Sequence, residues 1–227
     1  MKADFRGQLY CLTSEEHSLG RSVIETAEAM LAGGARILQY REKNKAKRLK
    51  YAECVALRRL TKERGCLFIV NDDVDIALAV KADGAHIGQD DLPLAAAREV
   101  LGPAAVIGVS THCPEQALAA ERGGADYIGV GPIYATRTKK DVCPAVGLEY
   151  LDYAVKNVKV PFVAIGGIKL RNLPEVLARG ASCIAMVTEL TAAPDIKSTA
   201  KEAISEIRKG IRKGDRLLFY SQKTSAG

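Results

Sequence analysis

The sequence predicts a single α/β domain folded as a (β/α)8 TIM barrel, and three observations support this prediction. Short apolar segments alternate eight times with segments that place apolar residues at helical spacing. The pair Gly-Ala recurs where a helix hands over to the second, fourth, sixth and eighth expected strands. The chain has 227 residues, an ordinary length for one such barrel.

The Gly-Ala pairs favour a closed sheet over an open one. Four copies of a two-strand, two-helix unit arranged in a ring would place one pair in each copy. Glycine is also the commonest helix terminator, which explains each pair singly but explains less easily their even-numbered positions. The pairs are Gly34-Ala35, Gly84-Ala85, Gly124-Ala125 and Gly180-Ala181.

The first expected elements follow from local signals. Residues 8–12 are apolar and end at Thr13-Ser14, which predicts a strand, and apolar residues at helical spacing predict a helix over 21–31. A second strand is expected over 35–41, followed by an amphipathic helix over 46–64. The apolar face of that helix is expected to hold Leu49, Ala52, Ala56, Leu57 and Leu60.

The remaining elements repeat this alternation. Strands are expected over 67–70, 85–87, 105–109, 125–130, 161–165 and 181–187. Helices are expected over 74–80, 93–101, 114–122, 148–155, 173–179 and 196–208. The barrel domain is therefore expected to span 1–209. Residues 210–227 are expected to form a partly ordered C-terminal tail without chemistry of its own.

The composition favours a small anionic ligand over a macromolecule. The net charge is +6, yet the basic residues are spread over many segments and only 5% of residues are aromatic, so nucleic acid is not expected. The six cysteines contain no Cys-x-x-Cys pair and are expected to be reduced packing residues. With no apolar leader and no membrane-length run, the protein is expected in the cytoplasm. The sequence leaves the oligomeric state open, and a homo-oligomer is compatible with it.

The segment 125–140 begins as a strand and ends as a loop suited to an anion. Gly129 and Gly131 allow a sharp turn and a close approach of a ligand, and Pro132 stops the strand. Two hydroxyls and three cations follow within five residues, as Thr136, Arg137, Thr138, Lys139 and Lys140. Taken alone, this segment would be interpreted as a solvated surface loop. Its polar partners at the other strand ends favour a phosphate site instead.

Polar side chains gather after the carboxyl ends of the strands, where a barrel carries its active site. Gln39, Arg41 and Lys43 alternate along an extended segment, so all three point to the same side. One amide and two cations at one place suit a diphosphate.

Two aspartates at adjacent strand ends indicate a magnesium site. Asp72 and Asp91, with Asn71 beside them, offer the few oxygen ligands that Mg²⁺ prefers when it also binds substrate phosphates. Asn71-Asp72 alone would more often be a helix cap. His86 lies inside a strand and is interpreted as a core histidine rather than a base, and Ser110 ends the fifth strand.

A second anion site is expected on the other side of the barrel mouth. Gly166-Gly167 follows the seventh strand and Val187-Thr188 follows the eighth, which is where barrels commonly bind a monophosphate. Two anion sites at one mouth imply either two phosphorylated substrates or one substrate with phosphates at both ends.

The order of these motifs resembles the thiamine-phosphate synthase family over residues 8–209. The motifs are Gln39-Tyr40-Arg41-Glu42-Lys43, Val70-Asn71-Asp72-Asp73, Ala85-His86-Ile87-Gly88-Gln89-Asp90-Asp91, Gly108-Val109-Ser110, Gly129-Val130-Gly131-Pro132 with Thr136-Arg137-Thr138-Lys139, and Ala164-Ile165-Gly166-Gly167-Ile168. The resemblance implies that a hydroxymethylpyrimidine diphosphate joins a thiazole phosphate or carboxythiazole phosphate, giving thiamine phosphate and pyrophosphate.

The resemblance also implies residue roles. Gln39, Arg41, Lys43, Asn71, Ser110 and Lys139 would hold the pyrimidine diphosphate, with Arg41, Lys43, Ser110 and Lys139 catalytic. Asp72 and Asp91 would coordinate Mg²⁺. Thr136, Thr138, Gly167, Val187 and Thr188 would hold the thiazole phosphate. The implied mechanism is dissociative, with pyrophosphate leaving before the thiazole nitrogen bonds, so no strong general base is required.

Two alternatives remain open. A thiazole tautomerase shares this fold, but it would need a base at the mouth and typically lacks the Gln-x-Arg-x-Lys and Gly-Pro signatures that this chain keeps. A non-catalytic sensor of phosphate ligands is the other, although a sensor would not need a metal site for a leaving group.

Overall fold

The computed structural model describes residues 4–136, 138 and 144–224, with side chains as far as Arg212. Eight parallel strands form a closed barrel in which each strand pairs with the next in sequence and the last pairs with the first. The strands are β1 (Gln8–Leu12), β2 (Ile37–Tyr40), β3 (Leu67–Asn71), β4 (Gly84–Ile87), β5 (Val106–Thr111), β6 (Tyr127–Val130), β7 (Phe162–Ala164) and β8 (Cys183–Met186). The predicted fold class is confirmed.

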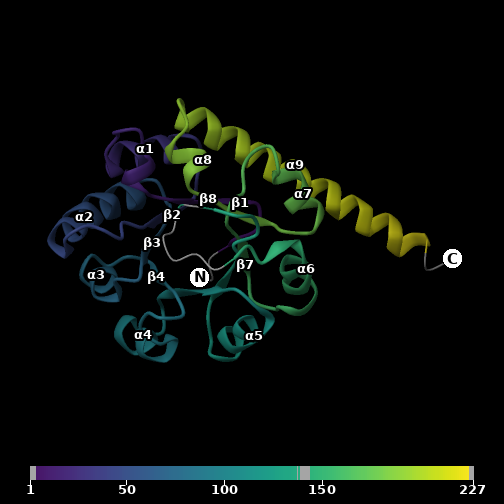
Figure 1. Ribbon diagram of the computed structural model, residues 1–227, viewed down its shortest axis with the longest axis horizontal. Coiled ribbons are helices and arrows are strands. Elements are labelled where there is room, and N and C mark those ends of the chain that lie inside the picture. Colours follow the sequence, from purple (N-terminus) through teal and green to yellow (C-terminus); the bar gives the residue numbers. More distant parts are fainter. Residues whose placement is uncertain (1–3, 137, 139–143, 225–227) are drawn as a thin grey trace.

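The helices surround this ring of strands, as Figure 1 shows. The helices are α1 (Val23–Ala32), α2 (Lys47–Glu63), α3 (Val74–Ala79), α4 (Leu94–Leu101), α5 (Pro114–Arg122), α6 (Gly147–Asn157), α7 (Leu173–Ala178), α8 (Thr188–Thr191) and α9 (Ile196–Thr224). A short 3-10 helix, η1 (Glu15–His17), follows β1. The sequence did not predict η1 or α8, which are too short to show a helical period.

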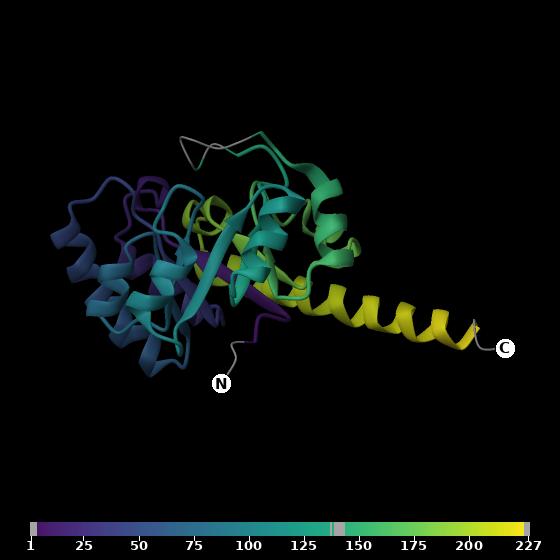
Figure 2. The same ribbon diagram turned by 90° about the horizontal axis from the view of Figure 1, so that it is seen from below.

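The last helix is longer than the sequence predicted. A helix ending at Arg208 was wrong, because α9 runs to Thr224 and extends beyond the barrel in Figures 1 and 2. Gly210 does not end this helix. A Cβ there would lie 2.8 Å from the Leu177 side chain, so the glycine allows α9 and α7 to pack closely. The division of the chain at residue 209 stays a prediction.

The buried face of α2 also differs from the expected one. Leu49 is 57% exposed and Ala52 is also exposed, whereas Leu57 is buried as predicted. The buried residues of this helix are Cys54, Leu57 and Thr61. Thr61 can be buried because its hydroxyl donates to the Leu57 carbonyl at 2.8 Å, so no polar group is left unpaired.

Two of the four expected two-strand repeats share a contact made by an aspartate. Asp83 precedes β4, accepts from the Phe68 amide of β3 and pairs with Arg58. Asp126 precedes β6, accepts from the Ile107 amide of β5 and pairs with Arg98. Each aspartate therefore ties an even-numbered strand to the strand before it at the amino end of the barrel.

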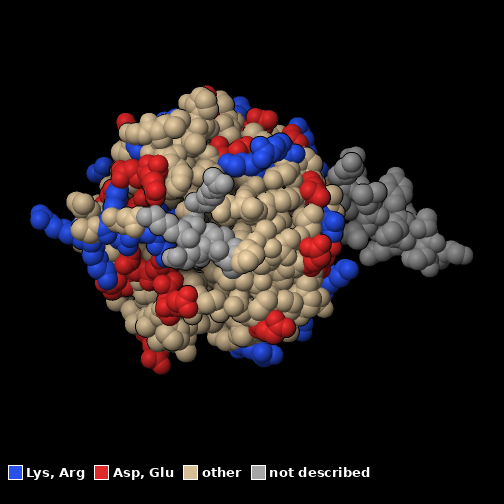
Figure 3. All heavy atoms as spheres, in the orientation of Figure 1, with Lys and Arg blue, Asp and Glu red and all other residues tan. Residues whose placement is uncertain are grey.

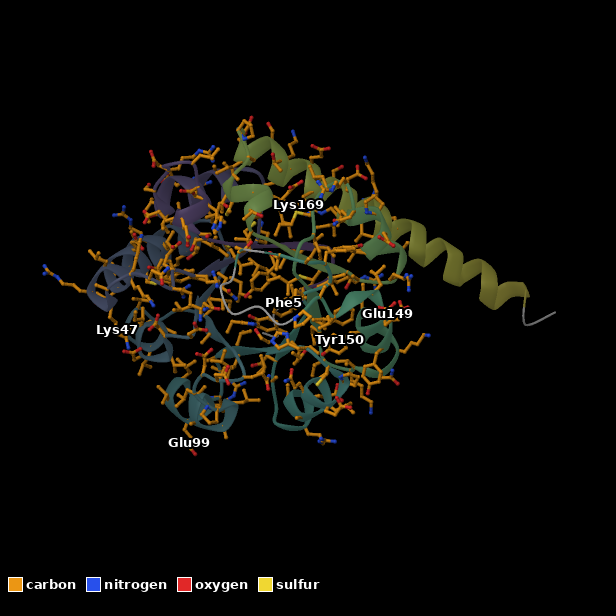
Figure 4. All side chains as sticks on the ribbon, in the orientation of Figure 1. Phe5, Lys47, Glu99, Glu149, Tyr150 and Lys169 are labelled. Carbon is orange, nitrogen blue, oxygen red and sulfur yellow. The ribbon has the colours of Figure 1, made fainter. Side chains whose placement is uncertain are left out.

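The barrel interior has its own packed layer. Phe5 closes its lower end against Tyr127, with ring centroids 4.6 Å apart, and its label lies at the centre of the ring in Figure 4. Ile37, Val163 and Ala185 pack in the same cluster. This apolar layer fills the amino end of the barrel, so the polar groups of the interior lie toward the carboxyl end of the strands.

Ion pairs occupy much of the outer surface near α2 and α3. Lys47 pairs with Asp75 at 2.7 Å and Lys50 pairs with Asp73 at 2.8 Å. Basic and acidic atoms accordingly lie together on that side of the face in Figure 3. Among the described residues, no helix has the length and apolar character needed to cross a membrane.

Candidate active site

One open cavity of about 170 Å³ lies at the carboxyl ends of the strands. Every candidate site residue that the structure describes contributes to its wall, and Lys139 lies outside the described residues. These wall residues are Gln39, Arg41, Lys43, Asn71, Asp72, Asp91, Ser110, Thr136, Thr138, Gly167, Val187 and Thr188. The barrel thus brings them together, while the role of each stays a prediction.

The segment after β2 presents cations to the cavity. The Arg41 amide donates to the Thr13 hydroxyl at 2.9 Å, which fixes the start of this segment against β1. Burial lowers the pKa of the Arg41 guanidinium, and the nearby Asp72 carboxylate opposes that shift. Lys43 forms an ion pair with Asp72. Two cations and one carboxylate therefore share this part of the wall.

Asp72 and Asp91 interact with each other at the mouth. Burial raises the pKa of Asp72; the Lys43 ammonium opposes this shift and the neighbouring Asp91 adds to it. The second oxygen of Asp91 accepts from the Gly88 amide at 2.7 Å, which holds the carboxylate in place. Two carboxylates this close repel unless a cation lies between or beside them.

Asp72 is not a helix cap, which removes the alternative interpretation of this residue. The N-cap position of α3 belongs to Asp73, whose side chain makes no capping hydrogen bond and pairs instead with Lys50. Asp72 has a positive φ of 61° and its side chain faces the cavity. Within the described residues no group of three or more His, Cys, Asp or Glu could hold a metal ion. Two carboxylates suit Mg²⁺, which also takes water and substrate oxygens.

A chain of hydrogen bonds runs across the cavity floor. The Gln39 amide donates to the Tyr10 hydroxyl at 2.9 Å, and the Tyr10 and Tyr127 hydroxyls lie 2.7 Å apart. The His86 Nδ1 lies 3.0 Å from the Tyr127 hydroxyl, and its Nε2 lies 2.9 Å from the Ser110 hydroxyl. His86 is buried, as expected, but it also lines the cavity.

The loops after β7 and β8 form the opposite wall. Gly166 and Gly167 have φ values of 99° and 64°, and a Cβ on Gly166 would lie 2.3 Å from the Cα of Pro132. Only glycine allows this loop to pack so closely on the loop after β6. The Thr136 and Thr138 hydroxyls lie 3.1 Å apart on that neighbouring loop. This wall therefore combines hydroxyls with tightly packed glycine backbone.

The sequence profile of the family described as thiamine monophosphate synthase matches residues 9–190, which include both walls of the cavity. The chain belongs to this family. The resemblance drawn from the motifs is confirmed, and the chain is an enzyme of the transferase class with a place in thiamine biosynthesis.

Individual members of the thiamine monophosphate synthase family are similar over most of their length. Thiamine-phosphate synthase of Pelotomaculum thermopropionicum is 58% identical over 193 residues, covering 85% of this chain and 88% of that protein. The enzyme of Lawsonia intracellularis is 50% identical over 203 residues, covering 89% and 92%. The solved structure of thiamine phosphate pyrophosphorylase from Pyrococcus furiosus superposes with a TM-score of 0.82 at 38% identity, covering 89% of this chain and 96% of that one.

Sequence reasoning missed four polar side chains that line this synthase cavity. The sequence assigned no role to Tyr10 and Tyr127, because only the closed barrel brings their hydroxyls together. Lys169 follows the Gly-Gly pair and lines the cavity, with its ammonium 2.8 Å from the Thr188 hydroxyl. His112 also lines it, and its Nδ1 lies 2.5 Å from the Gly131 carbonyl oxygen. A signal was available for Lys169, since it lies two residues after Gly167 on the expected phosphate loop.

Proposed function

We propose that this enzyme joins 4-amino-2-methyl-5-hydroxymethylpyrimidine diphosphate to a thiazole phosphate to give thiamine phosphate and pyrophosphate; the carboxylated form of the thiazole phosphate would in addition release CO₂. The observation that supports this most strongly is the division of one cavity into two unlike walls. Among the described residues, cations and carboxylates line the wall after β2 to β4, whereas hydroxyls, glycines and Lys169 line the wall after β6 to β8. Two phosphorylated substrates that react with each other require such a division.

The diphosphate belongs against the cationic wall. The Arg41 guanidinium can form paired hydrogen bonds with phosphate oxygens, and Lys43 adds a point charge. Asn71 and Ser110 line the same cavity; Asn71 can hold the pyrimidine end, and the Ser110 hydroxyl can donate to the diphosphate. Lys139, which lies outside the described residues, is proposed to complete the cationic set.

Magnesium fits the two carboxylates on this wall. Asp72 and Asp91 would hold Mg²⁺, with substrate oxygens and water as its other ligands. When bound, the ion supplies positive charge that stabilises the departing pyrophosphate. Lys43 already pairs with Asp72. Its ammonium therefore lies near the proposed diphosphate position and would bind the leaving group as negative charge develops on it.

The thiazole phosphate belongs against the opposite wall, with Thr136, Thr138, Gly167, Val187 and Thr188 as its proposed contacts. With the two phosphates on opposite walls, the thiazole nitrogen faces the methylene carbon of the pyrimidine. Holding both reactants in this way contributes much of the rate enhancement.

The substitution needs charge stabilisation more than proton transfer. The C–O bond to the diphosphate breaks with its electron pair going to pyrophosphate, and the thiazole nitrogen then donates its lone pair to the resulting pyrimidine-methyl cation. Arg41, Lys43, Ser110 and Lys139 are the proposed catalytic residues, because they contact the leaving group as its charge develops. Confinement of the two substrates between the walls would keep water away from the cation. We propose a cytoplasmic location and leave the homo-oligomer open.

Two alternatives can be separated from the synthase. Because a carbonyl only accepts, His112 must donate from Nδ1 to Gly131, which leaves its Nε2 unprotonated in that tautomer. This nitrogen is a candidate base for thiazole isomerisation, so isomerisation without the pyrimidine substrate would favour the tautomerase. Ligand binding without turnover would favour the sensor.

The test is to incubate the pure protein with both phosphorylated precursors and Mg²⁺ and to quantify thiamine phosphate and pyrophosphate by chromatography. Equal amounts of both products are expected, with none when the metal is omitted. Arg41→Ala is expected to abolish product while the protein stays folded, whereas Arg59→Ala, at an exposed position on α2, serves as the matched control. Product at parental rates from both Arg41→Ala and Lys139→Ala would count decisively against the proposal.

A further inference from the structure

Lys169 places a cation in the wall that is proposed to bind the thiazole phosphate. The residue follows β7, and its ammonium reaches α8, where it lies 2.8 Å from the Thr188 hydroxyl and 3.3 Å from a Glu189 carboxylate oxygen. It lines the cavity together with Gly167 and Thr188. In Figure 4 it lies on the α7–α8 side of the barrel, far from Lys47 on α2.

The backbone around Lys169 is fixed by its neighbours. The Asn172 side chain accepts from the Lys169 amide at 2.7 Å and donates to the Gly167 carbonyl at 3.1 Å. Glu189 accepts from the Leu170 amide at 2.9 Å through one oxygen and faces the Lys169 ammonium with the other. These contacts hold the lysine, the glycine loop and α8 in one arrangement before any ligand binds.

These contacts leave hydrogen-bonding capacity that a ligand could use. An ammonium has three donors, and among the described residues Lys169 directs two of them to Thr188 and Glu189. Thr188 accepts from the lysine, so its own hydroxyl proton is available to another acceptor. Both groups lie in the cavity wall, which suits a ligand that carries several acceptor oxygens.

Charge indicates which ligand gains most from this arrangement. The side chains of Lys169 and Glu189 are 26% and 22% exposed, so their interaction is only partly screened by water. A phosphate monoester carries about 1.5 to 2 negative charges at neutral pH and forms strong hydrogen bonds with ammonium groups. An alcohol offers one neutral oxygen and gains far less.

We propose that Lys169 is a specificity-determining residue that binds the phosphate monoester of the thiazole substrate, with Thr188 holding its ammonium in position and Glu189 pairing with it until the ester binds. This inference rests on the proposed function for the identity of the ligand. It assigns to Lys169 the selection of phosphorylated over unphosphorylated thiazole. A purely structural ion pair between the β7 loop and α8 would not produce this selection.

The test compares Lys169→Met with a matched control. Lys209→Met removes the same charge from another Lys-Glu pair, since Lys209 lies 2.7 Å from Glu206 on α9 and does not line the cavity. Calorimetry measures binding of thiazole phosphate and of the thiazole alcohol, without Mg²⁺ and without the pyrimidine substrate. Lys169→Met is expected to weaken phosphate binding about 10- to 100-fold and alcohol binding less than about twofold. Lys209→Met is expected to change neither.

Two further variants separate binding from structure. Lys169→Arg is expected to restore most of the preference for the phosphate. Glu189→Gln keeps the acceptor for the Leu170 amide but removes the competing charge, so phosphate is expected to bind at least as tightly as to the parent. A loss in Glu189→Gln equal to that in Lys169→Met, or equal losses of phosphate and alcohol binding in Lys169→Met, would overturn the proposal.

The outcome is independent of turnover. If the parent protein forms no thiamine phosphate but binds thiazole phosphate through Lys169, the proposed reaction fails and this inference stands. If the parent forms product and Lys169→Met retains its KM for thiazole phosphate, the inference fails and the reaction stands. In an active variant, the KM for the pyrimidine diphosphate is expected to stay within about twofold of the parent value, because that substrate binds the other wall.

Discussion

The Nε2 of His86 lies 2.9 Å from the hydroxyl oxygen of Ser110, at the boundary between the barrel interior and the cavity. The other ring nitrogen lies 3.0 Å from the Tyr127 hydroxyl, which in turn lies 2.7 Å from that of Tyr10. The Gln39 amide nitrogen can only donate, so the Tyr10 hydroxyl accepts from it. Tyr10 can then donate to the Tyr127 hydroxyl, and Tyr127 can donate to His86 Nδ1. We infer that His86 donates from Nε2 to Ser110, which leaves the serine proton for the substrate.

Removing the Tyr127 hydroxyl tests this chain. Tyr127→Phe leaves Tyr10 and His86 with a lost partner in a buried environment, so the free energy of unfolding is expected to fall by about 1–3 kcal/mol in urea titrations. The kcat is also expected to fall, because Ser110 is no longer oriented. Tyr150→Phe is the matched control, since its hydroxyl donates to Thr111 at 2.6 Å and the residue does not line the cavity. It is expected to lose similar stability and to keep its kcat; equal kcat values for the two variants would contradict the directional chain.

The two adjacent aspartates after β4 offer a sharp test of the metal site. Asp91→Asn is expected to raise the Mg²⁺ concentration for half-maximal activity at least about tenfold, because one of two carboxylate ligands is lost. The asparagine oxygen can still accept from the Gly88 amide, so the loop should keep its shape. Asp90 is exposed and does not line the cavity, and Asp90→Asn is expected to leave the metal dependence unchanged. Similar behaviour of the two variants would rule out Asp91 as a ligand.

Close packing of the glycine loop predicts a large effect of one added methyl group. Gly166→Ala would place a Cβ 2.3 Å from the Cα of Pro132 at a φ of 99°, so a loss of more than about 3 kcal/mol is expected in the free energy of unfolding. Gly124 has a φ of 84°, and an added Cβ there would have no atom within 4 Å. Gly124→Ala is therefore expected to cost only the backbone strain of about 1–2 kcal/mol. Chemical denaturation measures both, and equal losses would show that the close contact is unimportant.

Buried thiols predict a labelling pattern that depends on pH. Burial raises the pKa of both Cys54 and Cys66 to about 12, so these thiols stay protonated until the pH approaches that value. Only the thiolate reacts rapidly with iodoacetamide. At pH 8 the native protein should therefore show negligible alkylation of both residues by peptide mass spectrometry, and the denatured protein full alkylation. Native labelling of either residue at the rate of a free cysteine would contradict the packing described here.

Much of the fold follows from the sequence because its signals are local. The alternation of strands and helices is visible in the apolar period, and the parallel ring then places all strand ends at one mouth. The length of α9 was missed because Gly210 normally signals a helix end, whereas here it serves contact with Leu177. Leu49 and Ala52 were wrongly predicted to be buried. Helical spacing shows which residues share a face of α2, but it does not show how much of that face packs against the barrel.

The sequence predicted those site residues that directly follow the end of a strand. Arg41, Asp72 and Thr188 follow strand ends and so reach the cavity. The link between Tyr10 and Tyr127 depends on two strands 117 residues apart, and no local pattern indicates it. The Lys169 ammonium likewise acquires its place from Thr188 and Glu189, which belong to the next strand-helix unit.

The central claim is that two phosphate groups bind opposite walls of one cavity. A crystal structure of the protein with pyrophosphate, Mg²⁺ and thiazole phosphate tests it most directly. We expect pyrophosphate and the metal beside Arg41, Asp72 and Asp91, and the phosphate ester beside Gly167 and Lys169. Both anions on the same wall, or the thiazole phosphate bound outside the cavity, would contradict the claim.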